Sequence, residues 1–174
     1  MHLLGKIALV LTCLLAMPAL AQWKDWDYSL DEEKKSWQEL QAKLPAYPKP
    51  ENLLKFDIGA NSNNTFFVDA GSLSAGDDGV VRYTLVVKTS GGATNVSFEG
   101  IRCESRQARV YAFGHADRQW SRARNAGWHD IQHRQINGYH HVLLKDYFCS
   151  NRKHMLPLRD IVTALKNGPK HLSD

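Results

Sequence analysis

The sequence predicts an α+β fold, in which an antiparallel β-meander of about five strands packs with two to three helices and carries one disulfide. Three observations support this class. Short runs rich in β-branched and aromatic residues follow one another between positions 65 and 124, with turn residues between them. Helical patterns lie before and after these runs, so helices and strands are segregated along the chain. Beyond the first 21 residues, the chain has two cysteines, at positions 103 and 149.

The first 21 residues have the layout of a cleavable secretory signal. A basic start is followed by an apolar run over residues 7–17, then by a proline and the small-residue triplet 19–21. The apolar run is shorter than the ~20 residues that a bilayer core requires, so we expect no membrane span after cleavage. A lipoprotein signal would use Cys13, but Thr12 stands where a small residue is needed. We therefore expect cleavage after residue 21 and export to the periplasm or another part of the cell envelope.

The charge and length of the mature chain indicate one small domain without a nucleic-acid partner. Removal of the signal would leave 21 Lys and Arg against 18 Asp and Glu, a mild net charge of +3. We divide the chain into a signal peptide (1–21), an N-terminal helix and Pro-rich strap (22–52), a single α+β domain (53–167) and a C-terminal tail (168–174).

Residues 30–43 are predicted to form an amphipathic helix. Ser29 and Glu32 have the spacing of a capping box, and apolar residues recur at helical intervals. Prolines at positions 45, 48 and 50 then end the helix and favour an extended chain. We interpret this Pro-rich stretch as a structural strap, although its composition also suits a recognition segment.

Five strands are predicted in the central region. Their ranges are 65–70, 80–89, 93–103, 107–114 and 119–124. In the second of them, apolar residues occupy the odd positions from Val81 to Val87, and polar residues mark the other face. Turn residues follow one another at 77–79 and 91–92. The short connections favour an antiparallel meander over helical crossovers.

Two helices are predicted after the strands. Residues 139–149 would place Tyr139, Val142, Leu143 and Tyr147 on one face. The last helix has Pro157 at its start, a stripe of Leu158, Ile161, Val162 and Leu165, and Gly168 with Pro169 at its end.

Cys103 and Cys149 are expected to form one disulfide, because an oxidising compartment favours pairing of two cysteines in a small exported domain. The alternatives are two free thiols or an intermolecular bridge. No third mature cysteine and no C-x-x-C spacing supports redox chemistry or a metal site. The bridge would join the end of a strand to the end of the helix over residues 139–149.

Two groups of histidines raise a metal hypothesis. His129 and His133 have the i, i+4 spacing that a helix could use, but their segment has no helical apolar stripe. The adjacent His140 and His141 point in different directions on either a helix or a strand. We therefore predict no metal and no cofactor, and a metal-dependent hydrolase using these histidines is the third functional hypothesis.

No motif for catalysis occurs in the sequence. The G-x-S-x-G, H-E-x-x-H, P-loop and G-x-G-x-x-G patterns are all missing, and Asp77 with Asp78 reads as a turn. We therefore predict a non-enzymatic protein with no catalytic residue.

Arginines and aromatic residues are interleaved between positions 102 and 134, where seven arginines occur. The candidate ligand-binding residues are Arg118, Trp120, Arg122, Arg124 and Trp128. Such side chains can bind phosphate, a sugar or an acidic polymer through bidentate hydrogen bonds and stacking. The alternative is a solvated sheet face whose arginine stems cover aromatic rings, and the alternation in W-S-R-A-R favours it.

Several strings together resemble the cryptic-neisserial-protein-like family of exported proteobacterial proteins over residues 36–165. They are LPAYPKPENLL, FFVDAGSL, DGVVRYTLVVK, NVSFEGIRC, YAFG, WSRARNAGW and HHVLLKDYFC. This resemblance implies an envelope location and carries over no catalytic residue. The leading hypothesis is therefore a non-enzymatic module that binds or helps to assemble an envelope component.

A looser likeness is to the surface-adhesin protein E type. It rests on the order of Cys103, then Trp128 with Ile131, then Cys149. This likeness implies a curved sheet with a helix stapled across it, and binding of host matrix proteins or haem. A surface adhesin or haem-binding protein is accordingly the second functional hypothesis.

Overall fold

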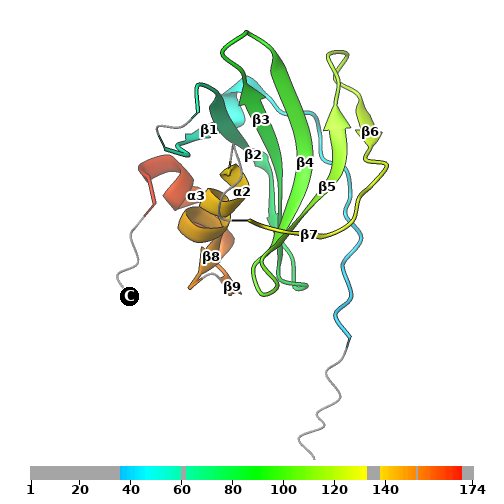
Figure 1. Ribbon diagram of the computed structural model, residues 1–174, viewed down its shortest axis with the longest axis vertical. Helices are drawn as coiled ribbons and strands as arrows, with labels where there is room; N and C mark the ends of the chain where they lie inside the picture. The colour runs from blue at the N-terminus through cyan, green and yellow to red at the C-terminus, as the bar shows by residue number, and fades with distance from the viewer. Residues whose placement is uncertain (1–35, 60–61, 133–137, 152, 170–174) are drawn as a thin grey trace, which may run out of the picture. The chain divides into compact units, whose positions relative to one another are not determined.

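Six strands follow one another as neighbours in one antiparallel sheet (Figure 1). The computed structural model describes residues 36–59, 62–132, 138–151 and 153–169, which from Trp37 onward belong to one compact unit. The strands are β1 (Leu53–Phe56), β2 (Thr65–Ala75), β3 (Val80–Lys88), β4 (Thr94–Arg102), β5 (Gln107–Gly114) and β6 (Trp120–Arg122). A seventh strand, β7 (His129–Asp130), pairs with the first two residues of β5, along the same edge on which β6 pairs with its last three. The predicted meander and fold class are confirmed, and β1 and β7 are additions that the sequence patterns do not predict.

One face of the sheet forms the hydrophobic core with the helices. Tyr83 of β3 and Ile101 of β4 are fully buried there. They pack with buried residues of η2 (Leu143–Phe148) and α3 (Leu158–Asn167) and with partly buried residues of α2 (Tyr139–Val142). The Tyr83 and Phe148 rings meet edge to face with centroids 5.1 Å apart. Figure 1 shows α2 and α3 together on this side of the strands. Burial of each such large side chain stabilises the fold by about 1.5–3 kcal/mol.

The predicted helix over 139–149 is present, but its second half is wider than an α-helix. Residues 143–148 form a π-helix, which turns with i to i+5 hydrogen bonds, and Cys149 already belongs to the short strand β8 (Cys149–Ser150). β8 pairs with β9 (His154–Met155) in a separate two-stranded sheet. The last helix, α3, is confirmed, with Pro157 before its first residue and Gly168 at φ 88° after its last.

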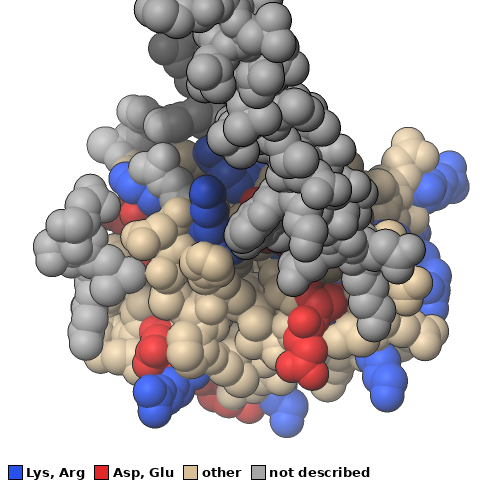
Figure 2. All heavy atoms as spheres, turned by 90° about the horizontal axis from the view of Figure 1, so that it is seen from below, with Lys and Arg blue, Asp and Glu red and all other residues tan. Residues whose placement is uncertain are grey.

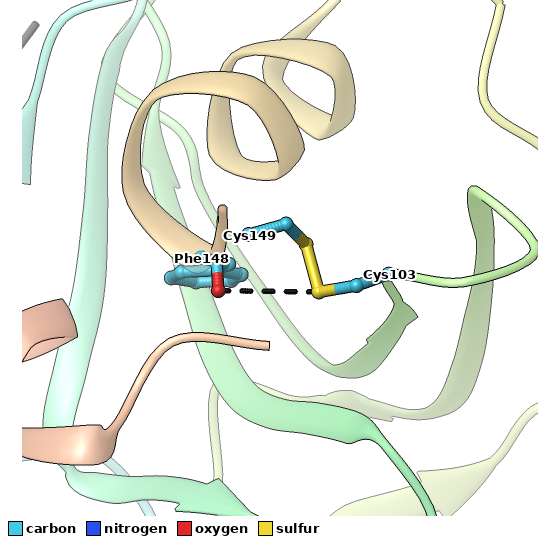
Figure 3. The surroundings of a disulfide bond; sticks show 3 residues. All are labelled: Cys103, Phe148 and Cys149. Carbon is cyan, nitrogen blue, oxygen red and sulfur yellow. Dashed lines mark hydrogen bonds between the residues drawn. A yellow bond between two sulfur atoms is a disulfide. The ribbon is translucent and has the colours of Figure 1, made fainter. Parts of the chain in front are cut away.

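Cys103 and Cys149 form the predicted disulfide, with their α-carbons 5.7 Å apart. The bridge ties the turn after β4 to the end of η2 (Figure 3). Figure 3 also marks the Phe148 carbonyl oxygen, 3.9 Å from Sγ of Cys103. Because a bridged sulfur carries no hydrogen, this is a packing contact inside the core and not a donated hydrogen bond.

The predicted helix over residues 30–43 is wrong for residues 36–43, and its first six residues lie outside the described ones. Residues 37–49, the covering segment, contain no helix or strand. The backbone N–H of Leu40 donates to Asp78 Oδ2 at 2.8 Å, and the Leu40 carbonyl accepts from Arg82 at 2.9 Å. Backbone groups of this segment therefore bond to the sheet, and these tertiary contacts override local helix propensity.

Candidate functional site

The covering segment lies over the face of the sheet opposite the helices. Trp37 donates its indole N–H to the Asp78 carbonyl at 2.8 Å, and Tyr47 donates its hydroxyl to the His115 carbonyl at 2.8 Å. The ribbon leading into η1 (Pro50–Asn52) runs along the β5 and β6 side of the sheet (Figure 1). The segment is thus held at both ends by hydrogen bonds to residues far away in the sequence.

Glu39 is the central anchor of the covering segment. Its carboxylate accepts hydrogen bonds from the Tyr111 hydroxyl at 2.6 Å, from the Trp128 indole at 3.1 Å and from the Arg109 guanidinium. The Arg82 guanidinium forms a longer ion pair with the same carboxylate, at 3.6 Å. Burial raises the pKa of Tyr111, and the neighbouring Glu39 carboxylate raises it further, so this phenol stays a donor at neutral pH.

We expect Glu39→Ala to loosen the covering segment. Removing the carboxylate leaves three donors without their acceptor, which should lower the free energy of unfolding by about 2 kcal/mol. Trypsin should also cleave after the exposed Lys43 faster than in the native protein. Urea denaturation and timed proteolysis measure the two effects. Gln41→Ala, an exposed change in the same segment, is the control and should alter neither; equal effects of the two variants would contradict the anchoring role.

A groove of about 260 Å³ lies between the covering segment and the chain around β5 and β6; we call it the Arg122 groove. Its walls combine apolar side chains with a few charged and polar ones. The lining residues are Glu39, Leu40, Gln41, Ala42, Leu44, Arg109, Tyr111, Arg122, Ala123 and Ala126. Leu40 is 51% exposed and Leu44 is 40% exposed, so the groove presents apolar surface to solvent. A small apolar group with one anionic end matches this lining.

The structure gives the five predicted ligand-binding residues different roles. Trp120 donates to the Pro45 carbonyl at 3.0 Å and Trp128 to Glu39, so both indoles hold the covering segment. The Arg118 guanidinium lies over the Tyr47 ring, 5.8 Å from its centroid. Arg122 and Arg124 are exposed, and neither has an ion-pair or hydrogen-bond partner within the described part of the chain.

Only Arg122 of these five also lines the groove. Arg109 at the groove is already paired with Glu39, which leaves Arg122 as the cation available to an incoming anion there. On the face that Figure 2 draws, basic and acidic side chains are interspersed among uncharged ones.

A second polar cluster is buried on the helix-covered face, around Glu99 of β4. This carboxylate is 1% exposed and accepts from Tyr83, Ser97 and His140, at 2.9, 2.5 and 2.8 Å. The Tyr139 hydroxyl completes the set at 3.3 Å. Burial alone would raise the pKa of Glu99, but the hydrogen bonds and charge of His140 and the Ser97 bond outweigh it and lower the pKa below its ordinary value. Glu99 is thus an ionised group inside the core.

The histidine groups of the sequence are arranged differently from either expected pair. His133 lies outside the described residues, so its relation to His129 is not defined. His140 points to Glu99, while the neighbouring His141 is itself buried. Instead, the rings of His129 and His140 lie together, with centroids 5.9 Å apart. No group of three or more His, Cys, Asp or Glu side chains that could hold a metal occurs among the described residues.

Sequence reasoning does not single out Glu39 or Glu99, the two carboxylates that organise these clusters. Glu99 shares the odd-numbered phase of Ile101 and Cys103, but the preceding odd positions of β4 are polar. The even-numbered Val96 and Phe98 are buried as well, so the pattern of β4 does not mark Glu99 as a core residue. Glu39 has no local signal, because its donors lie 70 to 89 positions further along the chain.

Comparison with known proteins gives one family match. The model of the CNP1-like family matches residues 32–166, which is most of the chain. No curated protein and no solved structure matches the sequence. Within the described residues, no helix is long and apolar enough to cross a membrane.

Proposed function

The chain belongs to the CNP1-like family, and we propose that it is an exported, non-enzymatic envelope protein that binds an anionic envelope component in the Arg122 groove. The observation that carries this proposal is the pairing pattern of the groove. Arg109 is neutralised by Glu39, whereas Arg122 has no partner among the described residues and stands beside exposed leucines. An unpaired arginine next to apolar surface favours a ligand with a carboxylate or phosphate and a small apolar part.

The size and charge of the groove favour a peptide carboxylate over a membrane surface. Its volume of about 260 Å³ is smaller than the usual ~300–1,000 Å³ of a pocket for a whole small molecule, so it fits an end group or side chain of a larger polymer. Binding to an anionic bilayer generally uses a cluster of several Lys and Arg side chains, whereas at this groove Arg109 is paired with Glu39 and Arg122 is the cation left available. The stem peptides of peptidoglycan carry carboxylates on short, flexible chains and meet the requirement.

Export is supported by two independent features. The buried Cys103–Cys149 bridge needs an oxidising compartment to form and persist. The first 21 residues have the basic, apolar and small-residue sections of a secretory signal. Periplasmic or other envelope placement brings the Arg122 groove within reach of peptidoglycan.

Sedimentation with purified sacculi tests the proposed ligand. The native protein should sediment with peptidoglycan, and binding should weaken as salt rises, because exposed charge pairs are screened. Replacing both Arg122 and Arg124 with Ala should lower the affinity at least tenfold. Loss of one charge-assisted hydrogen bond, which contributes about 1.5 kcal/mol, is enough to cause a change of this size.

A charge-matched variant separates site binding from general attraction. The double variant Lys153→Ala, Lys166→Ala removes the same amount of positive charge. Lys153 is exposed in the turn before β9 and Lys166 is exposed on α3, and neither lines the Arg122 groove. This control should bind as the native protein does. Equal loss in both double variants, or sedimentation with anionic lipid vesicles in place of sacculi, would overturn the proposal.

A further inference from the structure

His129 and His140 come together from two separate elements on the helix-covered face of the sheet. In the sheet register, His129 of β7 lies opposite Ala108 of β5, which in turn lies opposite Ile101 of β4. Residues directly opposite one another in antiparallel strands point to the same face, and Ala108 and Ile101 belong to the core. His129 therefore shares the face over which α2 places His140, and the two rings meet at 71°.

The bond to Glu99 fixes which nitrogen of His140 carries hydrogen. Both oxygens of Glu99 accept hydrogen bonds from hydroxyl groups, those of Tyr83, Ser97 and Tyr139, so Nε2 of His140, 2.8 Å from Glu99 Oε2, is placed as a further donor. In the neutral imidazole the other nitrogen, Nδ1, then holds a free electron pair. A histidine whose second nitrogen donates to a carboxylate is the arrangement that histidine ligands of metal ions usually have, because it orients the ring and makes the ligating nitrogen more basic.

We propose that His129 and His140 bind one divalent transition-metal ion of the zinc or copper type, with Glu99 as the positioning residue behind His140. Metal–nitrogen bonds of about 2.1 Å place two imidazoles that share an ion at roughly 5 to 6 Å between ring centroids. The separation of 5.9 Å meets this requirement. Imidazole ligands also match the preference of these ions over magnesium or calcium.

The site is open and its ion is exchangeable. Two histidines supply half of a tetrahedral shell, and the remaining positions are left for water or for an external ligand. His129 is exposed, while the His140 side chain is 14% exposed, so solvent reaches the pair from the β7 side. This placement suits capture or transfer of an ion in the envelope and is separate from the Arg122 groove.

Calorimetric titration of the untagged protein with Zn²⁺ tests the site. We expect one ion per chain, and affinity that falls as the pH is lowered from 7.5 to 5.5, because imidazolium must lose its proton to bind metal. His129→Ala should weaken binding at least tenfold. The Cε1 protons of His129 and His140 should shift together in NMR spectra as zinc is added.

His154→Ala is the matched control, since this exposed histidine lies on β9 and is not part of the pair. Its affinity for zinc should equal that of the native protein, and circular dichroism should confirm that both variants fold. An absence of stoichiometric binding, or equal affinity in the His129 variant and the native protein, would overturn the proposal.

Discussion

Replacing Glu99 with Gln is expected to lower the free energy of unfolding by about 3 kcal/mol at pH 7, because it breaks a buried charged network from one side. Glutamine matches the size of glutamate, but it has one acceptor oxygen in place of two and adds two donors. The hydroxyl of Tyr83 and the ring of His140 both donate to Oε2 of Glu99, so an amide nitrogen there would face donors. Urea denaturation measures the loss.

The pH dependence of this difference has a definite sign. The folded-state pKa of Glu99 is lowered from its ordinary value of 4.5, so its charge stabilises the fold above that pH. The contribution disappears as the pH falls through the lower folded-state pKa and the carboxylate takes up a proton. The stability gap between the native protein and the Gln variant should therefore be full at pH 7 and shrink between pH 4.5 and lower values.

Glu104→Gln gives the matched comparison. Glu104 carries the same charge in the turn after β4, but its side chain is 76% exposed and pairs with Arg102 at the surface. Exposed pairs of this kind contribute little, so this variant should stay within about 0.5 kcal/mol of the native protein. A gap for Glu99→Gln as small as that of Glu104→Gln would show that the buried network does not stabilise the fold.

The meander was predictable because its signals are local. In β3, the alternation from Val81 to Val87 predicts the face that packs against the helices, although residues 80–86 are buried on both faces of the strand. The glycine at position 79, with φ 74°, lies at the hairpin turn before this strand. β1 and β7 escape prediction because runs of four and two residues are too short to show a period. They form strands because each pairs with a longer neighbour, β1 with β2 and β7 with β5.

The covering segment could not be predicted from its own residues. Its spacing of Leu40 and Leu44 is helical, yet both side chains are exposed in the structure. The partners that hold Glu39 lie on β5 and just before β7, and no local pattern encodes a contact over that distance. The roles of two candidate site residues were missed for the same reason. The sequence predicts that Trp120 and Trp128 bind a ligand, but in the structure their indole groups donate hydrogen bonds to the covering segment.

Removing the disulfide is the change with the largest expected effect. Cys103→Ala with Cys149→Ala should lower the free energy of unfolding by about 4 kcal/mol, because the unfolded chain regains the freedom of a loop spanning 46 positions. Alanine at both positions avoids leaving a single reactive thiol and buries no hydroxyl in the core. Chemical denaturation of the oxidised native protein and of the double variant measures the difference.

Reductant separates the covalent bond from the packing of its sulfur atoms. With dithiothreitol present, the native protein should fall to nearly the stability of the double variant, while the variant itself should not change. Hydrogen exchange should show which segments lose stability. Amides of η2 and β8, which the bridge holds to the sheet, should lose protection before those of β3. A domain of this size has a net stability of about 5–15 kcal/mol, so a loss of this size leaves little margin in a reducing compartment. If reduction left the midpoint unchanged, the bridge would not be what holds the helices to the sheet, and the stability of the fold would not require an oxidising compartment.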